Sequence, residues 1–387
     1  MMTYKAIFTN AKGELAEKTT RKTYPQTKHP MGKMFSITGR AWSFITSHLP
    51  GEHFVINNTD EVTTFLHQAI EKLAPKGRVR ADIQDIEGCF PNMDKDTIRL
   101  AMRNITKQIQ INYNTEHIYV PTRRTLPCRW NTKDKRYKKI PLHVLNEVID
   151  FVLDNTLIKT LQGGLMRQEK GIPMGDPHSP AMCIGTCAWM EQEWMSTLSE
   201  DTKEYFKCGR YMDDVLLMSV QHENFDQDRL IDDMSKSDCY LPPLKLEAAR
   251  QDTFLETTFE ITRKNTIRHW LKNDNDIAKP PKIWRYAHFQ SYMAFAQKKR
   301  IMVACMRKVH KMASDAHALH ASAVKKLSEF WHLDYPDKLL WNVCTYMGVQ
   351  TRIKTWFDIR DNFQYVTKNP ALRVENRTVQ RPVMNHL

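Results

Sequence analysis

Two adjacent acidic residues, Asp213 and Asp214, lie between apolar stretches of the chain and limit the folds open to it more than any other feature. The surrounding segment, FKCGRYMDDVLLMSV over residues 206–220, predicts two short strands that meet at a polar turn. Two carboxylates between buried strands are unfavourable unless a positive charge offsets their negative charge. A divalent metal ion can supply that positive charge. A hairpin turn with solvated carboxylates is the alternative interpretation.

A third acidic residue, Asp85, stands near the end of a segment in which apolar and polar residues alternate. This segment, RVRADIQDI, predicts a strand. Three acids at the ends of adjacent strands can hold two Mg²⁺ ions about 3.5–4 Å apart, which promotes in-line phosphoryl transfer, and Mn²⁺ can replace Mg²⁺ there. Asp82 is a rival for this role, but the fifth residue after it is Glu87, whereas the fifth after Asp85 is the aromatic Phe90. We therefore expect Asp85 to join the two adjacent acids in a two-metal site.

The segment QEKGIPMGDPHSPAMCIG, over residues 168–185, is rich in turn-forming glycine and proline. It predicts a loop that leads into a helix starting near Ser179. Glycine lets a backbone approach a ligand closely, so such a loop can contact a nucleotide and a template. Taken alone, such a sequence usually forms only a surface loop.

Hydrophobic periodicity predicts most of the remaining elements. Residues 59–74, 94–110 and 142–160 show the spacing of amphipathic helices, and from about residue 280 to 350 the pattern is helical and basic. The segment INYNTEHIYV predicts a hairpin that turns at Asn114.

The charge balance favours a polyanionic partner, of which nucleic acid is the commonest. The chain has 57 Lys and Arg against 44 Asp and Glu, a net charge of +13. Cations are densest over residues 121–139, where Trp130 and Tyr137 stand among them. Rings can stack on bases while cations contact phosphates, although a solvated loop is an equal alternative. The cations expected to contact nucleic acid are Arg123, Arg124, Lys135, Arg136, Lys138, Lys139, Arg300 and Arg307.

Several classes of protein are not expected. The first residues lack the apolar core of a secretory signal, and no stretch is long and apolar enough to suggest a membrane span. The 8 cysteines include no CxxC pair; Cys183 and Cys187 could share a helix face, but no second pair completes a zinc site. Buried thiols in a reducing compartment are the expectation. We therefore predict an intracellular protein of the cytoplasm or nucleus that is not secreted.

Taken together and in this order, the three segments resemble motifs A, B and C of reverse transcriptases, most of all those of Penelope-like retroelements, whose relatives include telomerase. Residues 85–93, DIEGCFPNM, resemble motif A, and RYMDD, over residues 210–214, resembles motif C. The motif B pattern Q-x-x-G-x-x-M-G followed by Ser-Pro is matched by Gln168, Gly171, Met174, Gly175, Ser179 and Pro180. The likeness continues to about residue 340, through residues 241–261, which resemble motif D with Lys245 and then motif E.

The resemblance implies an α+β fold, that of a right-hand polymerase with an antiparallel-sheet palm, fingers and a helical thumb. Residues 1–78 would form fingers and an N-terminal region, and residues 79–110 and 142–265 the palm. Residues 111–141 would be a basic insertion in the fingers or in contact with nucleic acid, and residues 266–387 the thumb and a C-terminal tail.

The activity implied is that of an RNA-directed DNA polymerase, which extends a DNA or RNA primer on an RNA template with dNTPs. Asp85, Asp213 and Asp214 would be catalytic and, with Ile86, would bind two Mg²⁺ ions. Lys245 would neutralise or protonate the leaving pyrophosphate, although a solvent-exposed lysine is as good a reading. The nucleotide-binding positions implied are Phe90, Gln168, Gly171, Met174, Gly175 and Tyr211.

Two other functions remain open. An RNA-dependent RNA polymerase shares the same palm chemistry. Phe90 separates the two enzymes, because a bulky ring beneath the incoming sugar would exclude a 2′-hydroxyl, unless Phe90 is simply a core residue. The second alternative is a domesticated, non-catalytic nucleic-acid-binding protein, which the intact set of three acids disfavours. The sequence does not determine the oligomeric state.

Overall fold

The computed structural model describes residues 30–159, 165–223, 225–236, 239–249, 253–272 and 285–368. The chain divides into two compact units. The first comprises Met1–Asn57 and Ala81–Arg250, and the second comprises Asn58–Arg80 and Gln251–Leu387. The helix predicted over residues 59–74 therefore groups with the C-terminal part of the chain.

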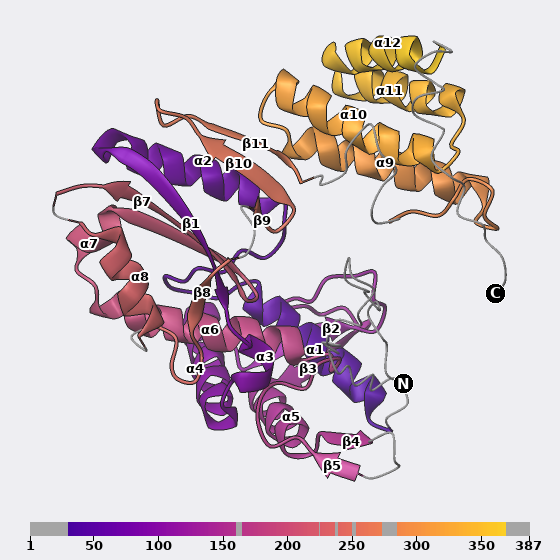
Figure 1. Ribbon diagram of the computed structural model, residues 1–387. Coiled ribbons are helices and arrows are strands. Elements are labelled where there is room, and N and C mark those ends of the chain that lie inside the picture. The colour runs from indigo at the N-terminus through magenta and orange to yellow at the C-terminus, as the bar shows by residue number, and fades with distance from the viewer. Residues whose placement is uncertain are drawn as a thin grey trace. The chain divides into compact units, whose positions relative to one another are not determined.

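The first unit combines helices with short antiparallel strands (Figure 1). Its helices are α1 (Gly32–Thr46), α3 (Cys89–Asn92), α4 (Lys95–Tyr113), α5 (Leu142–Asp154), α6 (Ser179–Thr197), α7 (Glu200–Glu204) and α8 (Gln227–Ser235). Its strands are β1 (Arg78–Ile86), β2 (His117–Pro121), β3 (Tyr137–Pro141), β4 (Leu157–Lys159), β5 (Leu165–Arg167), β6 (Phe206–Tyr211), β7 (Asp214–Gln221) and β8 (Leu246–Ala248). The first residues of β1 are grouped with the second unit.

One sheet of the first unit has the strand order β6-β7-β1-β8. Strands β6 and β7 pair antiparallel with Tyr211 opposite Asp214, and β1 and β8 pair antiparallel with Asp85 opposite Glu247. The interior of β7 is buried throughout, from Val215 to Val220, because every residue there is apolar or small. The predicted α+β fold with an antiparallel sheet is confirmed, as are the strand over RVRADIQDI and the two strands about the Asp213–Asp214 turn.

The core of the first unit is built around α6. Pro180 occupies its first turn, where a missing N–H costs nothing. Its residues 181–190 are apolar or small and almost all buried, a pattern typical of a helix enclosed by others, and it packs against α1 and α4. The predicted helix start near Ser179 is thus confirmed.

The predicted hairpin about Asn114 is wrong. Helix α4 continues to Tyr113, and Asn114 ends it with φ of 44°. Strand β2 pairs instead with β3, over the register from His117 opposite Pro141 to Pro121 opposite Tyr137. Asparagine accepts the left-handed conformation both in hairpin turns and after helix ends, so its presence alone does not distinguish the two.

The second unit contains mainly helices and a small antiparallel sheet. Its helices are α2 (Glu61–Leu73), α9 (Phe295–Met312), α10 (Ala316–His332), α11 (Asp337–Thr351) and α12 (Thr355–Lys368), and the short 3₁₀ turn η1 (Ala74–Lys76) follows α2. The strands β9 (Thr253–Phe254), β10 (Thr257–Ile261) and β11 (Ile267–Leu271) form its sheet. Helices α9 to α12 share one core that includes Met306, Phe330, Leu340 and Trp356. The helical region predicted from about residue 280 is confirmed from Phe295 onward, whereas residues 285–294 form no helix.

The described helices include none with the length and apolar character needed to cross a membrane. The predicted fingers residues 1–29 and the tail from residue 369 onward lie outside the described residues.

Candidate active site

The structure brings the strand that carries Asp85 next to the turn that carries Asp213 and Asp214. The backbone N–H of Ile86 donates to the carbonyl oxygen of Asp213 over 2.9 Å. All three acidic side chains are partly buried. Partial burial and the negative charges of Asp213 and Asp85 raise the pKa of Asp214 to about 6. The three carboxylates are therefore near enough for their charges to interact, which gives this edge of the sheet a concentrated negative charge.

The rival acid Asp82 has a different environment. Its carboxylate accepts a hydrogen bond from the side-chain amide of Gln227, at the start of α8. Ile86, the fourth residue expected to contact metal, is buried, and an isoleucine can offer a metal only its backbone carbonyl oxygen. The geometry favours Asp85 over Asp82 as the partner of the two adjacent acids.

The turn between β6 and β7 is held by a buried arginine. Met212, which precedes Asp213, has φ of 56°, a conformation that non-glycine residues seldom adopt. The Nη1 of Arg210 donates to the carbonyl oxygen of Met212 over 2.9 Å, and its Nη2 donates to the carbonyl oxygen of Ile184 in α6 over 3.2 Å. The guanidinium thereby ties the acidic turn to the central helix.

The charge of Arg210 is paired with Glu191 of α6, and both side chains are completely buried. Glu191 also accepts from the Tyr240 hydroxyl and from the backbone N–H of Phe54, each over 2.9 Å. A fully hydrogen-bonded pair of this kind avoids the penalty of a lone buried charge. Glu191 is not among the site residues predicted from the sequence, although an acidic residue directly after the apolar run of α6 is a visible signal.

The loop that resembles motif B docks on the segment that follows Asp85. Gly171 N–H donates to the Met93 carbonyl oxygen over 3.0 Å, and Ile172 N–H donates to the Phe90 carbonyl oxygen over 2.6 Å. Gly171 has φ of 78°, and a Cβ there would lie 2.5 Å from the carbonyl oxygens of Phe90 and Pro91. Only glycine fits this position, and the loop is held against the backbone of Phe90 and Pro91.

The other expected nucleotide-binding residues are placed less specifically. The side-chain amide of Gln168 donates to the backbone carbonyl oxygen of Lys170 over 2.8 Å. The backbone carbonyl oxygen of Gln168 accepts from the ammonium of Lys95 over 2.5 Å. Met174 is partly buried in the loop, and Tyr211 is partly buried at the end of β6. Phe90 is partly buried against the core.

Lys245 is placed by its backbone. Its carbonyl oxygen accepts from the N–H of Glu87 over 2.8 Å, which brings it beside the end of β1, and its side chain is exposed. This placement is compatible with both readings of the residue, a partner of the leaving group or a solvent-exposed lysine.

A buried hydrogen-bonded chain joins the loop to α1. Asp176 Oδ1 lies 2.5 Å from His178 Nδ1, and His178 Nε2 lies 2.7 Å from the Thr38 hydroxyl. The loop and α1 also line a cavity of about 510 Å³. Its lining is basic and includes Lys33, Arg40, Arg124 and Gly175. Arg40 is not among the residues predicted from the sequence, and its Nη1 is buried and makes no hydrogen bond.

The basic segment presents cations but not aromatic rings. Arg123, Arg124, Lys135, Arg136, Lys138 and Lys139 are all exposed. Trp130 stacks on Tyr113 with ring centres 4.4 Å apart, and Tyr137 is buried with the Arg129 guanidinium 5.5 Å from its ring centre. The expectation that these two rings stand ready to stack on bases is wrong, because both pack against the protein itself. The cations remain available, although Arg136 also pairs with Asp134 over 2.6 Å.

The two cations expected further along lie on α9 of the second unit. Arg300 and Arg307 are both exposed. Arg307 donates to the Tyr346 hydroxyl over 2.8 Å.

No protein-family model and no curated protein matches the sequence. Telomerase from Candida albicans, in a complex with a TWJ fragment of telomeric RNA, has a similar structure, with a TM-score of 0.58 at 12% identity over 87% of this chain and 57% of that chain. Telomerase from Candida tropicalis, in a complex with a TWJ fragment of telomeric RNA, has a TM-score of 0.47 at 12% identity, over 92% of this chain and 56% of that chain. The Sicinivirus RNA-dependent RNA polymerase has a TM-score of 0.41 at 11% identity, over 74% of this chain and 55% of that chain.

This chain spans 57% of the length of the first telomerase. At 12% identity, the similarity concerns the fold. The described chain therefore shares its α+β fold with part of that telomerase.

Proposed function

We propose that this chain is a template-directed polymerase, specifically an RNA-directed DNA polymerase that extends a primer with dNTPs. The observation that carries the proposal is the meeting of Asp85 with Asp213 and Asp214, in which the other two charges help to raise the pKa of Asp214 to about 6. The shared fold with telomerase supports it, and the telomerase structure contains RNA. The sequence motifs make Penelope-like retroelement enzymes the nearest model for the activity.

The donor set fits Mg²⁺. Carboxylate oxygens are the ligands Mg²⁺ prefers, and it keeps water and substrate phosphates in its remaining positions. Asp85, Asp213 and Asp214, with the carbonyl oxygen of Ile86, would hold two such ions, and Mn²⁺ could replace them. When bound, the ions supply activation of the primer 3′-hydroxyl and neutralisation of the triphosphate.

The remaining residues would position the substrates. The Gly171 loop, fixed on Phe90, would approach the incoming nucleotide, with Gln168, Met174, Gly175 and Tyr211 around it. The ring of Phe90 would lie beneath the sugar, and Lys245 would stabilise the leaving pyrophosphate. The exposed cations of residues 121–139, together with Arg300 and Arg307, would contact the phosphates of template and primer.

In this proposal the sheet β6-β7-β1-β8 with α4 and α6 is the palm, and helices α9 to α12 form the thumb. Helix α1 and the β2–β3 ribbon belong to the fingers, where the basic cavity beside Gly175 would receive phosphate groups.

Primer extension tests the proposal directly. Purified protein is given RNA or DNA templates, dNTPs or rNTPs, and Mg²⁺ or Mn²⁺. Extension with dNTPs on RNA is the expected result. Extension with rNTPs alone would instead favour an RNA-dependent RNA polymerase, and template binding without extension under every condition would favour a non-catalytic nucleic-acid-binding protein.

A further inference from the structure

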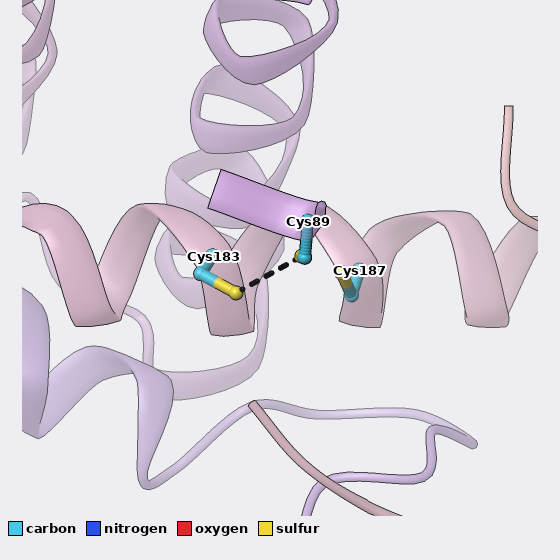
Figure 2. A group of neighbouring side chains, drawn as sticks. All are labelled: Cys89, Cys183 and Cys187. Carbon is cyan, nitrogen blue, oxygen red and sulfur yellow. Dashed lines mark hydrogen bonds between the residues drawn. The ribbon is translucent and has the colours of Figure 1, made fainter. Parts of the chain in front are cut away.

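Three buried cysteines from two separate parts of the first unit lie close together (Figure 2). One of them belongs to the segment that resembles motif A. Cys89 begins the short helix α3, while Cys183 and Cys187 lie one turn apart on α6. The Sγ atoms of Cys89 and Cys183 are 3.4 Å apart, and all three Sγ atoms lie within 4.8 Å of one another. None of the three forms a disulfide, and Figure 2 shows the sulfur of Cys183 directed toward Cys89, with Cys187 beside them on α6.

The local backbone explains how Cys89 reaches α6. Gly88 precedes α3 with φ of 58°, so the chain turns sharply after β1 and presents Cys89 to the core. The spacing of four residues places Cys183 and Cys187 on the same face of α6. Cys89 has 2% of its surface exposed, and the two helix cysteines have none. The cluster is therefore shielded from water and from chelating small molecules.

The spacing suits thiolate coordination. Sulfur lies about 2.3 Å from Zn²⁺, so two thiolates at a tetrahedral angle on one ion are about 3.8 Å apart. The one sulfur pair at 3.4 Å is slightly closer than this value, and the limit of 4.8 Å for all three pairs lies about 1 Å above it, so small shifts of the sulfurs would reach it.

The three thiols also interact with one another and with Arg210. Hydrogen bonds from Cys183 and Cys89 hold the pKa of the Cys187 thiol well below its usual range, and the positive charge of Arg210 lowers it further. A hydrogen bond with Cys183 raises the pKa of Cys89. A metal ion that entered the cluster would displace the thiol protons to solvent.

We propose that Cys89, Cys183 and Cys187 bind one thiophilic d¹⁰ metal ion of the Zn²⁺ class. The ion would join the segment after Asp85 to the central helix and so stabilise the fold. Sulfur ligands favour Zn²⁺, Cd²⁺ or Cu⁺ over Mg²⁺, so this site and the carboxylate site would take different metals. The proposal stands independently of the polymerase activity.

The alternative is that the three thiols are only small apolar residues that fill the core, a common role for free cysteine. Metal titration of the full chain separates the two. The metal-free, reduced wild-type protein is titrated with Co²⁺, whose bond to thiolate produces a charge-transfer absorption. We expect one Co²⁺ per chain, displacement by one equivalent of Zn²⁺ or Cd²⁺, and a higher unfolding temperature with metal bound.

Matched variants assign the site. Cys183→Ser and Cys187→Ser should weaken Co²⁺ binding by about tenfold or more. Cys208→Ser and Cys344→Ser, at buried cysteines outside the cluster, should bind as the wild type does. A folded wild-type protein that shows no charge-transfer absorption would overturn the proposal even if the cluster variants do not fold. Equal binding by cluster and control variants would overturn it as well.

Discussion

The backbone N–H of Ile86 and the carbonyl oxygen of Asp213 are joined by a hydrogen bond of 2.9 Å, and this bond registers two distant parts of the sequence against each other. It sets Asp85, which precedes Ile86, beside the turn that carries Asp213 and Asp214. The turn itself is fixed by Arg210, which is completely buried and bonds to the carbonyl oxygen of Met212. The acids are thus held on a rigid part of the sheet, as a metal site requires.

The raised pKa of Asp214 predicts a dependence of stability on pH. The folded-state pKa is about 6, against an ordinary value of 3.8. The folded protein therefore binds a proton more tightly than the unfolded chain, and this contribution to stability is complete below pH 3.8 and lost as the pH rises through 6. In metal-free protein, Asp214→Asn should raise the free energy of unfolding at pH 7 by about 1–3 kcal/mol.

Urea unfolding at several pH values measures this effect. The gain from Asp214→Asn should shrink between pH 6 and pH 4 and vanish below that range. Mg²⁺ should reduce the difference at pH 7, because the ion stabilises the wild-type carboxylate. A gain that does not change with pH would mean that the charge of Asp214 carries no penalty in the folded state.

The docking of the motif B loop predicts a strong effect at Gly171. Gly171→Ala places a Cβ against two backbone carbonyl oxygens and forces alanine to φ of 78°, so it should destabilise the protein by about 2–4 kcal/mol and impair primer extension. Gly51→Ala is a matched control, because Gly51 has φ of 84° but a Cβ there would meet only the Gln192 side chain. The control should lose about 1–2 kcal/mol and retain activity. Equal effects of the two substitutions in denaturant unfolding would show that the contact with Phe90 and Pro91 is unimportant.

Local patterns in the sequence were enough for the strand β1, whose bounds match the alternating run RVRADIQDI. The same kind of reasoning failed at Asn114, because a residue suited to a hairpin turn is equally suited to end a helix, and the apolar face of α4 decides between them. The prediction that the three acids belong together depended on motif order, and the strand pairing agrees with it.

Long-range packing could not be predicted from the sequence. Cys89 meets Cys183 and Cys187 only because α3 rests on α6, and no spacing in the chain encodes that contact. The ion pair between Arg210 and Glu191 is likewise a long-range contact. The only indication of it in the sequence is that each charged residue stands next to apolar ones. The packing of Trp130 on Tyr113 is also a long-range contact, and it occupies a ring that was expected to be able to stack on bases.

Phe90 is predicted to exclude ribonucleotides. Under this reading, Phe90→Val should raise the use of rNTPs relative to dNTPs at least tenfold, about 1.4 kcal/mol of lost discrimination. Steady-state incorporation of single nucleotides measures the ratio. Phe225→Val, at another partly buried phenylalanine of the first unit, is the control and should leave the ratio unchanged. If Phe90→Val slows both substrates equally and lowers stability, Phe90 is only a core residue.

The exposed cations of the basic segment predict the salt dependence of binding to an RNA–DNA duplex. Each phosphate contact adds about −0.9 to the slope of log K against log salt for B-form duplex. A variant in which glutamine replaces the four cations should have a shallower slope. These cations are Lys135, Arg136, Lys138 and Lys139.

The control for this experiment makes the same change of net charge elsewhere on the first unit. Glutamine replaces four exposed cations, Arg103, Lys107, Arg229 and Lys236. This control should retain the wild-type slope. Identical slopes for both variants would mean that the cations of the basic segment face solvent and do not contact phosphates.

The measurement that tests the central claim most directly compares Asp85→Asn with Asp82→Asn in primer extension on an RNA template. Both acids lie on β1, and the same substitution is made at each. We predict that Asp85→Asn, like Asp213→Asn, abolishes extension while template–primer affinity stays within a few-fold of wild type, and that Asp82→Asn remains active. Near-wild-type extension by Asp85→Asn would contradict the assignment of these acids to a two-metal polymerase site.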